Sequence, residues 1–268
     1  MAILSKEEAK QILEKVIGFS KADGCEVNLN GADNGNIRYA RNSVSTSGED
    51  SNISLAVQSY YGKKSGSATI NEFDDASLAK VVKRAEELAQ LAPENPEFME
   101  PLPQQTYLES KTYSEATAKI NPEYRAQAAS NSITPAAAKD ITAAGYLEDS
   151  RGFSAMMNSK GLFAYNQATS VDFTVTMRTN DGTGSGWVAR NFNDVSKLDT
   201  AEASKVAIDK ALMSRNAKAI EPGKYTVILE PSAGGDLVNL MLSAMNARQA
   251  DEGRSFLSKR GGGTKLGE

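Results

Sequence analysis

The side chains available for chemistry in this chain are carboxylates, hydroxyls and one thiol, because its 268 residues include no histidine. A Ser-His-Asp or Cys-His relay cannot be built without an imidazole. Catalytic zinc sites with three histidines, or with two histidines and a carboxylate, are excluded for the same reason. The one cysteine, Cys25, cannot form an intrachain disulfide or a cysteine-rich metal site. We expect it to be a small buried apolar residue.

Two pairs of adjacent acids and one basic cluster are the remaining candidates for binding a charged group. Asp74-Asp75 and Asp251-Glu252 could bind a hard cation, but helix capping and solvated loop charge are the simpler explanation. The basic cluster could hold a peptide carboxylate or the acidic surface of a partner, with a solvated loop as the simpler alternative. Its members are Arg248, Arg254, Lys259 and Arg260.

The glycine-rich stretch Gly261-Gly262-Gly263-Thr264-Lys265 invites comparison with a phosphate-binding loop. Its spacing is not that of the Walker motif, and no strand or helix context supports a nucleotide site, so we predict a flexible loop. Trp187 and Phe192 lie near a glycine-containing turn and are predicted to be core residues rather than a binding platform. The sequence therefore predicts no catalytic, cofactor-binding or metal-binding residue in this chain.

The first part of the chain predicts two amphipathic helices around a group of short strands. Ser5 and Glu8 form a capping box before a helix whose apolar residues recur at helical spacing up to Ile17. Asp74 or Asp75 can cap a second helix. Alternation of apolar and polar residues predicts strands at 26–29, 36–42, 53–60 and 65–70.

Four prolines between residues 93 and 103 mark a linker, because proline removes a backbone donor and biases the preceding residue towards extended forms. Residues 121–144 are predicted to be helical. A helix capped by Asp199 and Glu202 follows a second strand-rich region, and another helix carries the apolar residues of 237–245. The strands in this part are predicted at 155–158, 162–166, 171–177, 185–190 and 225–229. We accordingly divide the chain into segments 1–92, 93–144 and 145–268.

The predicted fold class is α/β (α+β), with two regions of mixed or antiparallel sheet flanked by amphipathic helices. Apolar and polar residues alternate along the predicted strands, whereas the strands of a buried parallel sheet are continuous apolar runs. Ser65-Gly66 leads through Phe73-Asp74 into a helix, and Ser185-Gly186 leads through Phe192-Asn193-Asp194 into another. We interpret the two halves as a duplicated unit. The alternative is chance, since strand-turn-strand-helix is a common local order.

Composition excludes several classes of partner. The net charge is −4 and the isoelectric point is about 5.2, so no basic footprint predicts direct nucleic-acid binding. No apolar run approaches the roughly 20 residues that span a bilayer, and the amphipathic start is unlike a signal peptide. We expect a cytoplasmic protein with no membrane contact.

Several stretches together resemble the TldD/PmbA family, also called modulator of DNA gyrase. The resemblance runs along nearly the whole chain; no single piece is a signature, but the order and spacing of the pieces together are specific. Its first part is carried by residues 37–44, 53–57, 62–68 and the helix that runs to Ala92-Pro-Glu-Asn-Pro-Glu97. Its second part is carried by Asn158-Ser-Lys-Gly-Leu162, Gly223-Lys-Tyr-Thr-Val-Ile-Leu-Glu-Pro231 and Asp251-Glu-Gly-Arg-Ser-Phe-Leu257.

The resemblance implies a part in a cytoplasmic metalloprotease that works as a two-subunit assembly. The metal-bearing subunit has an HExxxH helix shortly after the strand that corresponds to 227–229, where His and Glu converge on one metal and activate its water. The corresponding segment here, Asn239-Leu-Met-Leu-Ser-Ala244, has neither histidine nor acid. The chain therefore resembles the PmbA (TldE-type) subunit, with no cofactor of its own and a metal, zinc, only in the partner.

The partners implied are an HExxxH-bearing TldD-type subunit or a second copy of this chain, and an unfolded or extended peptide. Two other functions stay open: a non-enzymatic regulatory or interaction protein, and a divergent hydrolase that uses carboxylates only. Family members are longer than this chain, which stops in the glycine-rich stretch 261–268. We expect a fragment or a truncated reading frame, with the C-terminal β-rich region incomplete.

Overall fold

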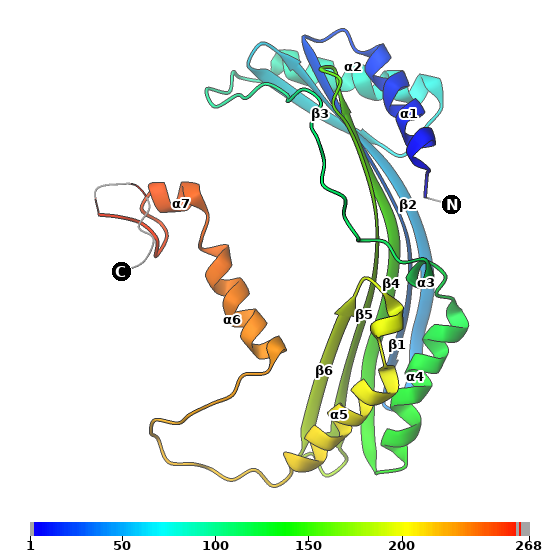
Figure 1. Ribbon diagram of the computed structural model, residues 1–268, viewed down its shortest axis with the longest axis vertical. Coiled ribbons are helices and arrows are strands. Elements are labelled where there is room, and N and C mark those ends of the chain that lie inside the picture. Colours follow the sequence, from blue (N-terminus) through cyan, green and yellow to red (C-terminus); the bar gives the residue numbers. More distant parts are fainter. Residues whose placement is uncertain (1–2, 261–262, 264–268) are drawn as a thin grey trace. The chain divides into compact units, whose positions relative to one another are not determined.

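The computed structural model describes residues 3–260 and 263. The chain forms two compact units, Met1–Ala217 and Lys218–Glu268, and each is described here by itself. The first unit holds the sheet and most of the helices, and the second holds two further helices (Figure 1). The predicted segment boundaries near residues 92 and 144 stay predictions, but strands from both sides of this linker lie in one sheet.

The first unit is built on one six-stranded sheet with strand order β3-β2-β1-β4-β5-β6. Every neighbouring pair in it is antiparallel, which confirms the predicted α+β class. Four of the strands are unusually long, and Figure 1 shows them curving from one end of the unit to the other. The strands are β1 (Gly24–Ala40), β2 (Ser43–Tyr61), β3 (Lys64–Ile70), β4 (Ile141–Asn158), β5 (Phe163–Thr179) and β6 (Ser185–Phe192).

The central strands are longer than the sequence predicts. The segments 26–29 and 36–42 were expected to be separate strands, but 26–29 and 36–40 are parts of the single strand β1, and residues 41 and 42 form the turn that follows it. The dipeptides Asn30-Gly31 and Asn34-Gly35 between them are typical of turns. Here they stay extended because β2 and β4 pair with β1 on both sides over this whole stretch. Tertiary pairing overrides the local turn preference.

Three helices begin at the caps that the sequence predicts, and one predicted helix ends earlier than expected. Ser5 and Glu8 form the predicted capping box, Asp74 caps α2 and Asp199 caps α5. The helix predicted over 121–144 is wrong beyond residue 137, because Asp140 adopts a left-handed conformation (φ 56°) and β4 begins at Ile141. The helices of this unit are α1 (Lys6–Phe19), α2 (Asp75–Leu91), α3 (Glu115–Ala118), α4 (Pro122–Ala137), the 3-10 turn η1 (Val195–Lys197) and α5 (Thr200–Met213).

All four long helices of this unit cover the same face of the sheet, which we call the covered face. Alternate strand residues such as Val27, Leu55 and Phe173 are buried there. Two cores result: α1 and α2 pack over one end of the sheet, and α4 and α5 pack over the other. The opposite face, which we call the open face, carries no helix of this unit. Most of its strand residues are the polar members of the alternating pattern, and Trp187 of β6 is an apolar exception.

The two halves of the sheet repeat one another, as the sequence suggests. A twofold rotation that exchanges β1 with β4 also exchanges β2 with β5 and β3 with β6. In the first half, a Cβ on Gly66 would lie 2.2 Å from the Ala89 nitrogen of α2. In the second half, a Cβ on Gly186 would lie 2.1 Å from the Ala207 oxygen of α5. Each half therefore uses a glycine to bring its last helix against its outer strand.

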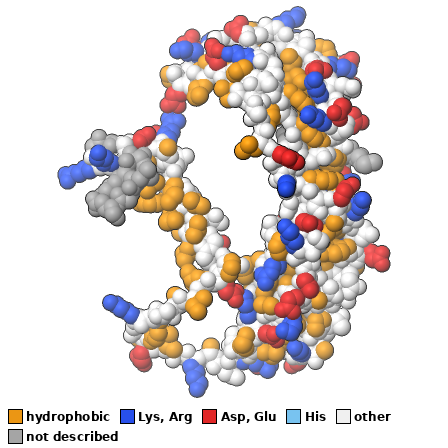
Figure 2. All heavy atoms as spheres, in the orientation of Figure 1, with side chains coloured by type: hydrophobic (Ala, Val, Ile, Leu, Met, Phe, Trp, Pro, Cys, Tyr) orange, Lys and Arg blue, Asp and Glu red, His pale blue; other side chains and the backbone are white. Residues whose placement is uncertain are grey.

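The second unit holds α6 (Pro231–Ser243) and α7 (Ala247–Asp251). The strand predicted at 225–229 is wrong: this segment is not a strand, because no other described strand pairs with it. Within the second unit no residue of α6 is buried, and Figure 2 shows hydrophobic side chains gathered along this helix. The exposed set on α6 is Leu237, Val238, Leu240, Met241 and Leu242.

Candidate functional site

The middle of the open face holds a hollow of about 420 Å³. It lies where β2, β1, β4 and β5 run side by side and where no helix of the first unit covers them. Asp50 is the only charged residue among those that line it. The other polar side chains are amides and hydroxyls: Asn30, Asn34, Asn52, Ser54, Ser150, Ser154, Asn166, Thr169 and Ser170.

Amide and hydroxyl side chains give this hollow an uncharged surface that both donates and accepts hydrogen bonds. Such groups can match the N–H and C=O groups of an extended polypeptide without selecting its side-chain charge. The Asn34 amide donates to the Asp50 carboxylate at 2.9 Å, so the one charged side chain of the hollow already has a hydrogen-bond partner within the sheet. The hollow suits binding of a neutral, hydrogen-bonding chain better than acid–base chemistry.

Directly behind the hollow, the covered face carries a buried ion pair. Arg125 of α4 donates two hydrogen bonds to Asp149 of β4, from Nε at 2.6 Å and from Nη2 at 3.0 Å. Its Nη1 donates to Glu49 of β2 at 2.7 Å. The bond with Asp149 raises the pKa of Arg125 above its ordinary value. Gly35 leaves room for the guanidinium, since a Cβ there would lie 1.7 Å from Nη2.

A second ion pair joins the two halves of the sheet. Arg151 of β4 lies opposite Asp33 of β1 and donates to its Oδ2 from Nη2 at 2.9 Å and from Nε at 3.1 Å. Both pairs lie between the two helix-covered cores and line a cavity of about 380 Å³. The first pair anchors the start of α4 to the sheet, and the second joins β1 to β4 beside it.

The linker runs beside β5 where β6 does not reach (Figure 1). The Thr169 nitrogen donates to the Thr112 oxygen at 2.9 Å, and the Thr112 hydroxyl donates to the Gln167 oxygen at 2.7 Å. Further along the same edge, the Phe163 nitrogen donates to the Gln104 side chain at 2.9 Å. The linker therefore satisfies part of an otherwise open sheet edge.

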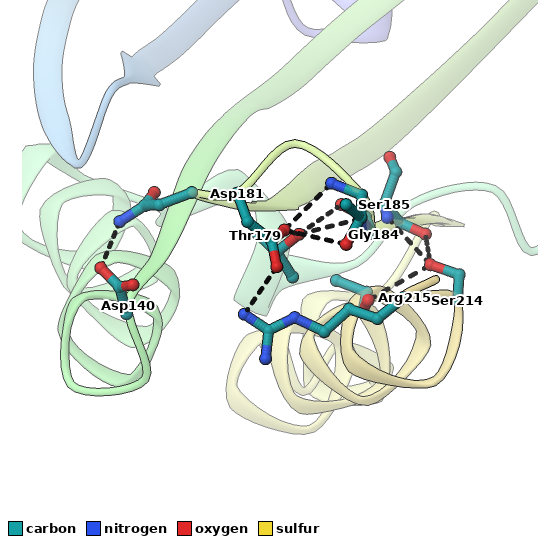
Figure 3. Close-up of polar contacts among 10 residues, drawn as sticks. Asp140, Thr179, Asp181, Gly184, Ser185, Ser214 and Arg215 are labelled. Carbon is teal, nitrogen blue, oxygen red and sulfur yellow. Dashed lines mark hydrogen bonds and ion pairs between the residues drawn. The ribbon is translucent and has the colours of Figure 1, made fainter. Parts of the chain in front are cut away.

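A third polar cluster closes the turn between β5 and β6 (Figure 3). The Asp181 carboxylate accepts from the Thr179 hydroxyl at 2.6 Å and from the Thr183 nitrogen at 3.0 Å, and it pairs with Arg215 at 3.4 Å. These hydrogen bonds, led by that of Thr179, lower the pKa of Asp181 from 3.8 to about 2. These partners all belong to the turn or to the end of α5 and the residues after it, so the cluster stabilises the turn.

Asp181 gives this turn a defined acid dependence. Because the pKa of Asp181 is lower in the folded chain, the carboxylate stabilises the fold fully above about pH 3.8 and loses this effect as the pH falls towards 2. We expect Asp181→Asn to lower the free energy of unfolding by a constant amount above pH 4 and by a shrinking amount below it. Urea unfolding at several pH values measures this, with Asp209→Asn on α5 as the surface-charge control. A difference that grows on acidification would contradict the assignment.

The structure places the acid pairs and the basic cluster in local roles. Asp74 accepts from the backbone nitrogens at the start of α2, and Asp75 pairs with Lys15 of α1 at 2.7 Å. Glu252 accepts from Arg248 Nε at 2.9 Å and also pairs with Arg254. Two members of the basic cluster are thus held by an acid of the same segment. Lys259 and Arg260 are exposed.

Of the three residues predicted to be buried in the core, two are buried or packed against it and one is exposed. Trp187 was predicted to lie in the core, but it is 45% exposed, because it alternates with the buried residues Gly186 and Val188 and so falls on the open face. Phe192 packs against the core as predicted. Cys25 is buried as predicted, and burial raises the pKa of its thiol to about 11, which keeps it protonated at neutral pH. Of the stretch 261–265, only Gly263 lies within the described residues.

The sequence has no histidine, and the described residues contain no group of three or more Cys, Asp or Glu placed to hold a metal ion. The acids Asp149 and Glu49 lie close to one another, but both form ion pairs with Arg125. Among the described residues, no helix is long and apolar enough to cross a membrane.

Family models match three successive parts of the chain. They describe the first domain, the central domain and the C-terminal domain of PmbA/TldA metallopeptidases, and they match residues 25–89, 107–215 and 222–268. The sheet, its covering helices and the second unit thus correspond to one metallopeptidase-related class of protein. The chain belongs to the TldD/PmbA family, as its sequence resemblance predicts. No curated protein is similar enough to the sequence to match it.

Solved structures show the same fold. A candidate modulator of DNA gyrase from Bacteroides thetaiotaomicron aligns with a TM-score of 0.81 at 18% identity, over 95% of this chain and 61% of its own length. A candidate gyrase modulator from Thermotoga maritima aligns with a TM-score of 0.82 at 17% identity, over 92% of this chain and 58% of its own length. TldE from Thermococcus kodakarensis aligns with a TM-score of 0.69 at 14% identity, over 78% of this chain and 47% of its own length. The chain therefore spans less than two thirds of the length of these relatives.

Sequence reasoning missed both the open face and the ion pairs behind it. A signal for the open face exists in β1, where Asn28, Asn30, Asn34 and Asn36 recur at even positions. The Asn-Gly dipeptides hide it, because they suggest turns. The pairing of Arg125 with Asp149 leaves no local signal, since the two residues come from different elements and meet only through the tertiary fold.

Proposed function

We propose that this chain is the metal-free subunit of a TldD/PmbA-type cytoplasmic metalloprotease that acts in the proteolysis or maturation of unfolded peptides. The observation that carries the proposal is the complete absence of histidine from a chain that all three metallopeptidase family models match. The helix α6, which follows the segment 225–229, has no imidazole to offer a metal. Zinc then belongs to an HExxxH-bearing TldD-type partner, and self-association is the alternative assembly.

The open face supports a role in holding peptide. Its hollow is polar and nearly uncharged, so it accepts a polypeptide backbone while discriminating little among side chains. A subunit of this kind contributes a wall along which an extended chain lies before it reaches the partner's metal. The proposal includes no membrane contact and no direct contact with nucleic acid, in keeping with a net charge of −4.

The deciding experiment is cleavage of an unstructured peptide by the full-length form of this protein, by the HExxxH-bearing relative from the same source, and by a mixture of both. We expect cleavage only in the mixture. Equal activity of the relative alone would reduce this chain to a dispensable interaction partner. Zinc-dependent cleavage by this chain alone would overturn the proposal.

A further inference from the structure

The long strands β2 and β5 each extend beyond the shorter outer strand beside them. β3 pairs with β2 only from Leu55 to Tyr61, and β6 pairs with β5 only from Val171 to Arg178. Residues 43–54 of β2 and 163–170 of β5 are therefore without an outer strand. Because the twofold repeat exchanges β2 with β5, these two stretches are corresponding edges of the sheet.

The chain itself occupies the β5 edge. Residues 104–114, which form neither helix nor strand, contact it through one backbone hydrogen bond and several side-chain hydrogen bonds. The Ser110 hydroxyl adds a bond to the Asn166 side chain at 2.8 Å, and the Ser114 nitrogen donates to the Thr169 hydroxyl at 2.9 Å. This edge shows what the fold accepts there: a segment rich in hydroxyl and amide side chains.

The corresponding β2 edge is bare in the part of the chain that the structure describes. Every residue of 43–52 is exposed. The side chains of this stretch form hydrogen bonds towards the inside of the sheet: Ser45 and Ser47 donate to backbone oxygens of β1, and Glu49 accepts from Arg125. No described strand lies on the outer side of these residues.

This bare edge has two acidic residues and a register irregularity near its start, but it lacks the other usual protections against strand addition. Natural edges are blunted by proline, lysine or very short strands, but 43–54 contains no proline and no basic residue, and it belongs to a 19-residue strand. Its charges are Glu49 and Asp50. A second copy pairing through the same edge would bring two such acidic pairs together, which disfavours self-association because like charges across strands repel.

We propose that the outer edge of β2 at residues 43–54 binds an extended segment of another polypeptide, with lysine or arginine placed opposite Asp50 on the open face. The segment adds to the sheet as a further antiparallel or parallel strand, as peptides do in β-augmentation. Asp50, Asn52 and Ser54 also line the open-face hollow, so the added strand continues that surface. The inference deepens the proposed function by assigning the peptide to one edge, and it rests on that function.

The test uses the full-length protein and two unstructured 12-residue peptides that alternate threonine with either lysine or glutamate. We expect the lysine peptide to bind and to slow amide hydrogen exchange in 43–54, with no change in 163–170, where the linker already lies. A lysine peptide with every second amide N-methylated should not bind, since it cannot form the backbone ladder. Tighter binding of the glutamate peptide would overturn the charge assignment.

Charge reversal supplies a matched pair of variants. Asp50→Lys should weaken binding of the lysine peptide about fivefold, the effect of one cross-strand charge contact, and should strengthen binding of the glutamate peptide. Glu94→Lys, on an exposed loop, changes net charge equally and should alter neither.

The outcomes separate this inference from the proposed function. Binding with protection outside 43–54 would overturn the edge assignment while cleavage by the subunit mixture leaves the protease role in place. Failure of all peptides to bind would also overturn the edge assignment. Loss of cleavage in the mixture despite protection of 43–54 would instead overturn the protease role.

Discussion

Replacing Arg125 with alanine is expected to lower the free energy of unfolding by about 3–5 kcal/mol, because it leaves a buried charge without its partner. The Arg125 side chain is 4% exposed and that of Asp149 is 10% exposed. Both Asp149 oxygens accept from the guanidinium, so the variant strands a carboxylate that water reaches poorly. Urea unfolding of the purified chain measures the loss.

The neighbouring ion pair provides the control. Arg151 and Asp33 are 38% and 18% exposed at the side chain, so Arg151→Ala should cost no more than about 1 kcal/mol. The double variant Arg125→Met with Asp149→Leu should recover much of the loss, since apolar replacements of a buried pair leave no charge stranded. Equal costs for Arg125→Ala and Arg151→Ala would show that burial does not set the strength of these pairs.

Gly186→Ala and Gly66→Ala are each expected to destabilise the fold by about 1–3 kcal/mol through overpacking. At Gly186 the new Cβ would lie 2.1 Å from the Ala207 oxygen, and at Gly66 it would lie 2.5 Å from the Ala85 oxygen. These are helix backbone atoms, so relief requires α5 or α2 to move away from its strand. Thermal or urea unfolding detects the change.

Gly48→Ala in β2 is the matched control. The nearest atom to its Cβ would lie 4.0 Å away, so the variant should be unchanged or more stable by up to about 1 kcal/mol, because glycine weakens strand interiors. Similar losses at Gly66 and Gly186 would support the duplicated unit, since both glycines perform the same packing task. A neutral result at either position would contradict the close approach of helix and strand.

The sequence by itself determined the features that depend on near neighbours. The capping box of Ser5 and Glu8 and the cap at Asp199 are formed as predicted, because a cap joins residues only three apart. Burial of Cys25 and the order of most elements also follow from local alternation. The lack of histidine excluded whole classes of chemistry without any structure.

Tertiary structure alone decided how distant segments meet. β1 continues through two Asn-Gly dipeptides because strands on both sides supply its hydrogen bonds. Trp187 lies on the open face because the register of β6 places Gly186 and Val188 inward. Arg125 reaches Asp149 only because α4 crosses the sheet over Gly35. The local sequence pattern specifies which residues alternate between the two faces of a strand. Pairing between strands remote in sequence decides which face lies against the helices and which side chains become partners.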